Sequence, residues 1–397
     1  MSLRGAAAVI GLAERAPSRY TDGETNLDVL AGVGVDAIRD AGLTLADIDG
    51  LVVHPIGGLP GFVPATVAEH LGLRPRYAEL VDLGGATSAG MVWRAAAAIA
   101  AGMCTTCLCL TGTRRRRRPP PAPSNGGSRS ASRAGRDRSP HAEFEAPYGS
   151  IGANVGYAQL AARYDHEYGS SDASRAKVAV DQRANAGANP DAIFHGQPLT
   201  IDDVLASEMI CEPLRRLEIV MPAAGAAALV VTAADRAPLG PHQPVWLLGA
   251  GESVTHSSLA QAPSLTETGV AIAADAAFSM AGVDRTDVGL ASLYDCYTIM
   301  VLLSLEDAGF CPKGEAAAFV TEHDLCWSGD FPVNTHGGQL SFGQPGMAGG
   351  MSHVTEAVRQ LQGRAAGRQI ADLEVAYVHG NGGIIAEQVG LVLSGSR

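Results

Sequence analysis

Apolar and polar positions along the chain follow one block pattern twice, at an offset of 240 residues. Residues 41–54 read AGLTLADIDGLVVH and residues 281–294 read AGVDRTDVGLASLY. Each block combines a helix end, a polar turn with an Asp, and a short run of strand character. An apolar strand ending in glycine precedes each block (AAAVIGL from Ala6, PVWLLGAG from Pro244). The pattern predicts a duplicated strand–helix–strand unit, and therefore an α/β fold of two similar halves packed together.

The rest of the pattern supplies further elements and a division of the chain. Helices are expected over 27–41, 91–102, 156–168, 171–186, 268–281, 298–308 and 352–362. Strands are expected over 51–55, 76–83, 104–110 and 373–379, and 222–231 is predicted to pass from helix to strand. The Ala-rich stretch 91–102 is almost wholly apolar, so we expect a centrally buried helix there. We assign residues 1–240 to an N-terminal half and 241–397 to a C-terminal half.

Composition narrows the class of protein. The 397 residues carry a formal net charge of −12, which argues against a nucleic-acid-binding protein. No apolar run approaches the length of a membrane span. The seven cysteines are scattered and odd in number, which favours a reducing, cytoplasmic location over a disulfide framework. Cys104, Cys107 and Cys109 share an apolar strand without a second ligand pair, so we interpret them as buried thiols and expect no metal site.

One segment departs from this composition. Residues 114–138 contain nine Arg and one Asp, a local charge of +8 in an otherwise acidic chain. The segment lacks hydrophobic periodicity, and we interpret it as a solvated loop or disordered insert. Two alternatives stay open: an electrostatic arm for anionic ligands such as CoA phosphates, and a frameshifted stretch of GC-rich coding DNA.

Three motifs carry candidate chemistry. YDCYT at 294–298 places five ionisable or hydroxyl-bearing side chains at a strand-to-helix turn, although one of them is expected to cap the helix. The glycine-rich stretch 333–353 brings backbone N–H groups close to a ligand, as oxyanion holes require. HGNGG at 379–383 places a His at a strand end beside a glycine turn, a position suited to acid–base catalysis.

Together these segments resemble the thiolase superfamily, specifically its lipid-transfer-protein or sterol-carrier-protein type branch. The resemblance covers nearly the whole chain outside 114–138. It implies two βαβαβαββ halves in a five-layer αβαβα sandwich, usually a dimer, that acts on acyl-CoA thioesters. Chains of this branch also work with a small OB-fold acyl-CoA-binding partner.

The sequence departs from the thiolase pattern at the catalytic positions. The nucleophilic Cys of thiolases corresponds to Gly85, and the His of their His-Pro-Gly loop corresponds to Gln344. Their second, acid/base Cys corresponds to His379. Thr87 or Ser88 could replace the nucleophile, although small residues at a helix start are the simpler explanation.

The resemblance extends to branch members that lack the Cys and cleave β-hydroxyacyl-CoA esters by a retro-aldol step in sterol side-chain degradation. It implies Tyr294 as the base, His379 as its partner or the acid, and Gln344 as the donor to the thioester oxygen. These aldolases use a second Tyr in the glycine-rich loop, where this sequence offers Gln344 or Met347. The expected substrate contacts are Gly85, Thr87, Asp295, Cys296, Gly343, Gly346, Gly380, Asn381 and Gly382.

Two other functions are compatible with the sequence. One is a catalytically silent lipid-transfer or acyl-CoA-binding subunit, because every thiolase catalytic position is substituted. The other is an acetyl-CoA acetyltransferase with displaced residues, for instance with Cys296 as the nucleophile. In each case we expect a homodimer, no cofactor beyond the CoA of the substrate, and no nucleic acid or membrane span.

Overall fold

The computed structural model describes residues 3–21, 23–59, 61–117 and 139–397, so most of the Arg-rich segment lies outside the described residues. The predicted duplication is present within them. The two repeated blocks form the same turn of 3₁₀-helix, at Leu45–Asp47 and Arg285–Asp287. In both turns the Asp carboxylate accepts the backbone N–H three residues earlier at 2.8 Å. The matching sequence therefore encodes matching geometry.

The described strands form one nine-stranded sheet of order β3-β2-β4-β7-β1-β8-β11-β10-β9. The strands of the first half are β1 (Ala7–Ser18), β2 (Gly50–Val53), β3 (Tyr77–Leu80), β4 (Thr106–Thr113) and β7 (Ala224–Ala233). Those of the second half are β8 (Val245–Val254), β9 (Leu290–Ser292), β10 (Val375–Gly382) and β11 (Glu387–Ser394). The halves join where β1 pairs with β8 at two positions only.

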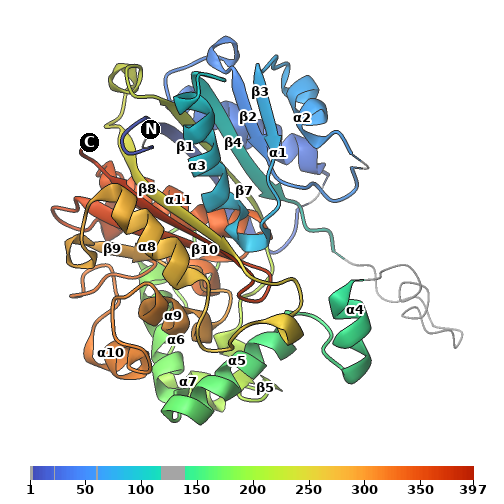
Figure 1. Ribbon diagram of the computed structural model, residues 1–397, viewed down its shortest axis with the longest axis vertical. Coiled ribbons are helices and arrows are strands. Elements are labelled where there is room, and N and C mark those ends of the chain that lie inside the picture. Colours follow the sequence, from blue (N-terminus) through green and yellow to red (C-terminus); the bar gives the residue numbers. More distant parts are fainter. Residues whose placement is uncertain (1–2, 22, 60, 118–138) are drawn as a thin grey trace, which may run out of the picture.

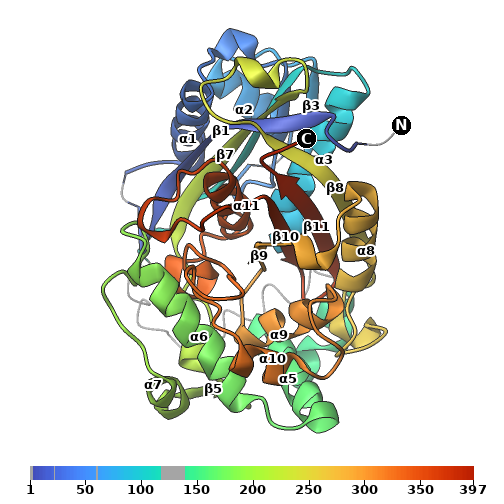
Figure 2. The ribbon, with the colours of Figure 1, turned by 90° about the vertical axis from the view of Figure 1, so that its left-hand side faces the viewer.

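Helices cover both faces of each half-sheet in five layers (Figures 1 and 2). The helices α1 (Asn26–Asp40) and α2 (Val63–Leu71) pack outside the first half, and α8 (Val270–Ala281) packs outside the second. Between the halves lie α3 (Thr87–Ala100) and α11 (Ala348–Leu361), which contact each other and strands of both halves. The predicted central burial of the Ala-rich helix is thus confirmed.

Three local predictions differ from the structure. Residues 222–231 contain no helix, because Ala224–Ala233 is the buried strand β7 between β1 and β4. The last predicted strand continues through His379 to Gly382, where it pairs with β11. The second half lacks a full third strand, which is reduced to a single bridge between Ala291 and Val333. The chain before that bridge forms helices instead.

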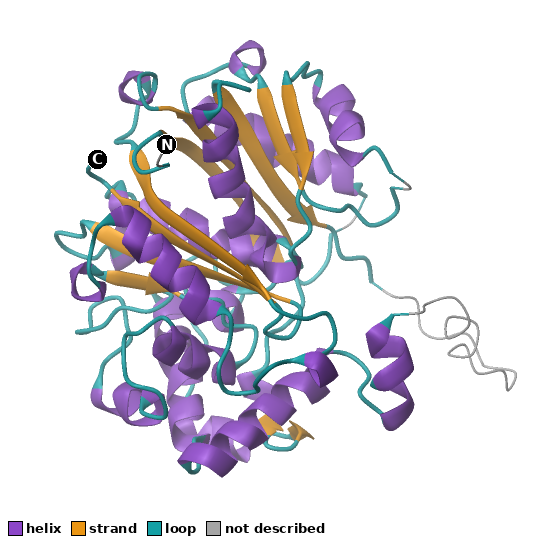
Figure 3. Ribbon diagram, in the orientation of Figure 1, coloured by secondary structure: helices purple, strands orange, loops and turns teal. Residues whose placement is uncertain are grey.

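A second group of helices lies at one end of the sheet (Figure 3). Between β4 and β7 the chain forms α4 (Pro140–Phe144), α5 (Ala153–Tyr168), α6 (Asp172–Gly187), α7 (Ile201–Ala206) and the hairpin β5 (Met209–Cys211) and β6 (Leu214–Arg215). The second half adds α9 (Thr298–Asp307) and α10 (Ala316–Glu322). Within the described ranges, no helix is long and apolar enough to cross a membrane.

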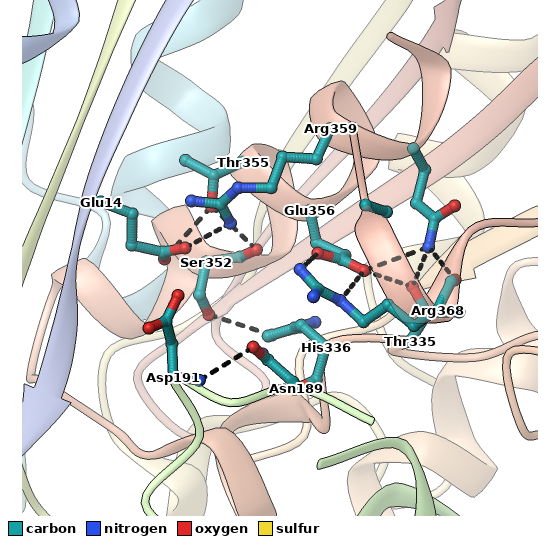
Figure 4. Close-up of polar contacts among 12 residues, drawn as sticks. Glu14, Asn189, Asp191, Thr335, His336, Ser352, Thr355, Glu356, Arg359 and Arg368 are labelled. Atoms are coloured by element: carbon teal, nitrogen blue, oxygen red, sulfur yellow. Dashed lines mark hydrogen bonds and ion pairs between the residues drawn. The ribbon is translucent and has the colours of Figure 1, made fainter. Parts of the chain in front are cut away.

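A buried polar network fixes α11 to the segment that leads into the glycine-rich loop (Figure 4). The Arg368 guanidinium donates to both carboxylate oxygens of Glu356, at 2.9 and 2.7 Å, and the Thr335 hydroxyl donates to the same carboxylate at 2.7 Å. Ser352 lies 3.2 Å from a ring nitrogen of His336. Burial alone would raise the pKa of Glu356, but the Arg368 charge lowers this pKa to about 2. The carboxylate is therefore ionised in the core.

Replacing Arg368 with Met leaves this buried carboxylate unpaired and is expected to cost about 3–5 kcal/mol of the free energy of unfolding at pH 7. In the parent, the folded pKa lies below the unfolded value of about 4.3, so the stabilisation is complete above pH 4.3 and is lost as the pH falls toward 2. In the variant, burial raises the pKa of Glu356, so lowering the pH from 7 stabilises the fold relative to the parent.

Urea unfolding of both proteins between pH 7 and pH 3 tests this prediction. The matched control is Arg364→Met, which removes a partly exposed ion pair with Asp40 and should cost below about 1 kcal/mol. A stability difference between Arg368→Met and the parent that stays constant with pH would contradict the assignment.

Candidate active site

A cavity of about 390 Å³ opens where the second helix group meets the strand ends. Its wall is formed by Gly85 in the turn before α3, by residues of α5, by the segment 219–222, by Gln344 of the glycine-rich loop, by the turn after β9 and by the end of β10. The lining residues are Gly85, Ala153, Asn154, Tyr157, Ile219, Val220, Pro222, Tyr294, Cys296, Tyr297, Gln344, Asn381 and Gly383. The cavity therefore collects residues from both halves.

Gly85 lies directly against Tyr294 in this cavity. A Cβ atom on Gly85 would lie 2.2 Å from the Tyr294 hydroxyl oxygen and 2.4 Å from the Asn381 carbonyl oxygen. No real Cβ atom is tolerated at such distances, so position 85 admits glycine only in this arrangement. The phenol of Tyr294 thus occupies the space into which any side chain at position 85 would project.

Glycines of the other two motifs let their segments approach the same helix start. A Cβ on Gly350 would lie 2.3 Å from the Gly85 carbonyl oxygen, and one on Gly382 would lie 1.9 Å from the Leu83 carbonyl oxygen. Gly380 similarly packs against Ala86. Gly380 and Gly382, expected to contact substrate, do not line the cavity; they permit close backbone packing.

Gly343 and Gly346 also lie outside the lining. Both adopt positive φ, at 129° and 55°, where they turn the chain from the loop toward α11. A Cβ on Gly343 would meet Ile193 and Pro17, and one on Gly346 would meet Thr113. Substrate contact by Gly343 and Gly346 stays a prediction. Their positive φ angles are sufficient to explain why glycine occupies both positions.

Tyr294 is a buried, neutral phenol. Burial raises its pKa above the ordinary value of 10, the neighbouring Cys296 adds to the rise, and hydrogen bonding by Gln344 and Gln339 acts in the opposite direction. The phenolate is therefore absent at pH 7. Tyr294 can exchange a proton only in concert with another transfer, and Gln344 favours that exchange by stabilising the oxygen.

Cys296 lines the cavity but is poorly suited to nucleophilic attack. Burial raises the pKa of its thiol to about 12, and the thiolate is the form that attacks. Tyr297 follows it in the lining and donates its hydroxyl hydrogen to the Asn154 side chain at 2.6 Å. These residues present a neutral, hydrogen-bonding wall.

Asp295 points away from the cavity and anchors the glycine-rich loop. Its carboxylate accepts the backbone N–H groups of Gln339 and Leu340 at 2.8 and 3.1 Å and lies 3.1 Å from His353. It does not cap α9, and neither does Thr298, whose hydroxyl bonds Glu218. The expected helix cap within YDCYT is therefore wrong.

His379 does not contact Tyr294. Its ring is buried between Ser304, 3.3 Å from Nδ1, and Gln388, 2.8 Å from Nε2, and it does not line the cavity. Burial lowers its pKa to about 4, so the imidazole is neutral at pH 7. Its predicted partnership with Tyr294 would require a contact that the structure does not have, and any effect it exerts passes through Gln388.

Thr87 and Ser88 are engaged at the start of α3. The Thr87 hydroxyl accepts the Leu83 N–H at 2.9 Å, and the Ser88 hydroxyl donates to the Met347 carbonyl at 3.0 Å. Neither hydroxyl lines the cavity or faces a base. The simpler explanation of small residues at a helix start agrees with these contacts.

Asn154 and Tyr157 line the cavity although no sequence motif marks them. They stand on an amphipathic helix with no local motif, and only the fold brings them to Tyr294. The one signal in the sequence concerns Tyr157, whose polar side chain falls on the buried face of the helix predicted over 156–168; Asn154 precedes that helix. Cys104, Cys107 and Cys109 are buried and unpaired, as predicted. Among the described residues, no group of three His, Cys, Asp or Glu could hold a metal ion.

Comparisons with known proteins agree with this architecture. The profile of the family described as "Thiolase C-terminal domain-like" matches residues 251–395. The chain is 32% identical to a steroid side-chain-cleaving aldolase of Thermomonospora curvata, over 100% of this chain and 99% of that protein. It is 30% identical to the 17-hydroxy-3-oxo-4-pregnene-20-carboxyl-CoA lyase of Mycobacterium tuberculosis, over 96% and 98%.

A solved structure described as an Ltp2-ChsH2(DUF35) aldolase superposes with a TM-score of 0.86. It shares 31% sequence identity and covers 100% of this chain and 99% of its own. The match extends through both halves, so it includes every wall of the cavity.

The contact at position 85 predicts the effect of a single methyl group. Gly85→Ala should displace Tyr294 and the Asn381 backbone and lower the free energy of unfolding by about 1–3 kcal/mol, the usual cost of overpacking. The matched control is Gly32→Ala on α1, where a Cβ meets nothing within 4 Å and should be neutral or stabilising by up to about 1 kcal/mol. Equal unfolding midpoints for Gly85→Ala and the parent would show that the contact is not tight.

Proposed function

Because this chain belongs to the thiolase superfamily, in its lipid-transfer-type branch, we propose that it is a retro-aldolase that cleaves β-hydroxyacyl-CoA esters. The observation that carries the proposal is the Tyr294 phenol against Gly85. A thiolase-type acyl-enzyme needs a side chain at that position, and a retro-aldol cleavage needs none. The relatives named as a side-chain-cleaving aldolase and a carboxyl-CoA lyase support the same chemistry.

In the proposed reaction the oxygen of the neutral Tyr294 phenol accepts the proton of the β-hydroxyl group while its own hydrogen moves toward the α-carbon and the Cα–Cβ bond breaks. The electron pair of that bond passes into the thioester enolate, and the β-carbon becomes a ketone or aldehyde. Arrival of the Tyr294 hydrogen at the α-carbon gives the shortened acyl-CoA, and the proton taken from the β-hydroxyl group restores the phenol. The step is redox-neutral, so no resident cofactor is proposed. Gln344 lies beside Tyr294 to stabilise its oxygen and to donate to the thioester oxygen.

A second cavity of about 420 Å³ adjoins the first and suits a bulky apolar acyl group. The two cavities share Asn154 and three residues of the 219–222 segment. The remaining lining of the second cavity is largely apolar: Arg183, Phe194, Ile210, Arg216, Leu217, Met221 and Leu340. Apolar walls with few polar groups are typical of sites for hydrophobic ligands. We assign this cavity to the part of the substrate released as the ketone or aldehyde.

Positive charge at the cavity supports a CoA ester. The Arg115 guanidinium donates to the carbonyl of Pro222, which lines both cavities, at 2.9 Å. Arg116 and Arg117 follow and are exposed. Exposed guanidinium groups bind phosphates well, which favours the interpretation of 114–117 as the start of a CoA-phosphate arm.

We also propose that the protein forms a homodimer and that it binds an acyl-CoA-binding partner protein. The edge strand β3 exposes Leu80 and has an unpaired side, which suits pairing with a second copy in a homodimer. The related structure is described as a complex with a DUF35 protein, which supports an acyl-CoA-binding partner of that type. A cytoplasmic location remains a prediction.

Incubation with a panel of β-hydroxyacyl-CoA and β-ketoacyl-CoA esters tests the activity. The proposal predicts a carbonyl product and a shortened acyl-CoA from the hydroxy esters without free CoA. Cleavage of keto esters only, and only with free CoA, would mean thiolysis. Binding without cleavage, with the DUF35-type partner present, would favour a silent acyl-CoA-binding subunit.

Tyr294→Phe removes the proton-relaying oxygen and should lower kcat by at least 100-fold with the unfolding midpoint preserved. The matched control is Tyr377→Phe, because the Tyr377 hydroxyl is equally buried but has no hydrogen-bond partner among the described residues. Full activity of Tyr294→Phe would remove Tyr294 from the mechanism.

The apolar cavity predicts a change in specificity. Leu217→Trp fills part of it and should raise KM about 10-fold for esters with a bulky β-substituent, while short-chain esters keep their KM. Leu205→Trp, on α7 outside the cavity, is the control. An equal rise for short and bulky esters would contradict the assignment.

A further inference from the structure

Tyr157 is a second phenol in the cavity, and its position gives it a defined hydrogen-bonding direction. It projects from α5, is 2% exposed and stacks on Tyr297 with ring centroids 4.2 Å apart. Its oxygen accepts a hydrogen bond from the Asn381 side-chain amide at 2.7 Å, and its hydroxyl donates to the Gly383 carbonyl at 3.1 Å. Asn381 and Gly383 also line the cavity.

A chain of buried side chains leads to this phenol from the interior of the second half. His379 Nε2 lies 2.8 Å from the Gln388 carbonyl oxygen, and the Gln388 amide donates to the Asn381 carbonyl oxygen at 2.8 Å. Asn381 then donates to Tyr157. His379, Gln388 and Asn381 are each at most 1% exposed, so no water competes for these bonds.

The Gly383 carbonyl fixes the direction of the whole chain. A phenol has one hydrogen, and a backbone carbonyl can only accept, so the Tyr157 hydrogen points to Gly383. The Tyr157 oxygen must then accept from Asn381, which sets the orientation of the Asn381 amide and, in turn, that of Gln388. The Gln388 carbonyl oxygen must therefore accept its hydrogen bond from His379 Nε2. A neutral imidazole carries one N–H and can supply that hydrogen. Every bond therefore donates toward the cavity.

We propose that Tyr157 is a further catalytic residue, whose hydroxyl turns from Gly383 to the thioester oxygen of the substrate and stabilises the developing enolate. This inference rests on the proposed function. No proton is transferred: the O–H bond stays intact, and the chain behind it polarises the donor. Burial raises the pKa of Tyr157 far above 10, which keeps the hydrogen in place. Asn381, Gln388 and His379 are positioning residues in this account.

The test combines turnover with the infrared carbonyl stretch of a bound acyl-CoA that lacks the β-hydroxyl group and carries ¹³C at the thioester carbon. Tyr157→Phe should lower kcat about 100-fold, as loss of one oxyanion donor does elsewhere, with little change in KM. The carbonyl stretch, shifted to lower frequency on binding to the parent, should return toward its value in solution. Tyr168→Phe on the same helix, outside the cavity, should change neither.

Asn381→Asp provides a second variant of nearly the same shape. A carboxylate at 381 accepts from both Gln388 and Tyr157, so it holds the Tyr157 hydrogen in a bond to residue 381 with the phenol still present. The frequency shift should be lost as in Tyr157→Phe. A shift that persists in both variants, or an ester that binds the parent with no shift, overturns the inference.

The same measurements separate this inference from the proposed reaction. A Tyr157-dependent shift without any cleavage by the parent contradicts the retro-aldolase function alone. Cleavage by the parent with a shift independent of Tyr157 contradicts the inference alone. Failure of the parent to bind any acyl-CoA contradicts both.

Discussion

The contact between the Tyr294 phenol and the backbone of Gly85 is the constraint on which the rest of the site depends. The Tyr294 phenol and the Asn381 carbonyl lie too close to Gly85 for any side chain at position 85. The Gly85 carbonyl in turn lies too close to Gly350 for any side chain at position 350. Two segments of the second half therefore meet the first half at backbone distance. The space of a thiolase nucleophile is filled by the group we propose to relay the proton.

A consequence of this packing is that the described residues that line the 390 Å³ cavity include no charged side chain. Burial raises the pKa of Tyr157, Tyr294 and Cys296, so all three side chains keep their hydrogens at pH 7. The side chain of Asp295, between Tyr294 and Cys296 in the sequence, is turned to the backbone of the glycine-rich loop. The proposed cleavage therefore depends on oriented hydrogen-bond donors and on a concerted proton relay. The low dielectric constant of the buried cavity strengthens these hydrogen bonds.

The sequence predicted the parts of this structure that local pattern controls. The repeat with Asp47 and Asp287 identified the two halves, because the same turn chemistry recurs, and the apolar stretch 91–102 identified the central helix. The sequence also named five site residues that line the cavity: Gly85, Tyr294, Cys296, Gln344 and Asn381. Gln344 stands in the glycine-rich loop, and the other four lie at or just after strand ends.

Residues positioned by long-range packing could not be found in this way. Tyr157 belongs to a helix inserted between β4 and β7, and its direction is set by residues more than 200 positions later. His379 occupies a strand-end motif, yet the alternation of β10 turns its ring toward Ser304 on α9 instead of the cavity. Segment 222–231 carries helix-forming alanines, but its place between two strands makes it β7.

The central claim is that carbon–carbon cleavage here proceeds without an acyl-enzyme, and the most direct measurement is the intact mass of the protein quenched during turnover of a β-hydroxyacyl-CoA. Non-covalent cleavage gives an unmodified protein mass at every time point while carbonyl product and shortened acyl-CoA accumulate in equal amounts. A protein carrying the mass of an acyl group, formed and lost at the rate of turnover, would contradict it.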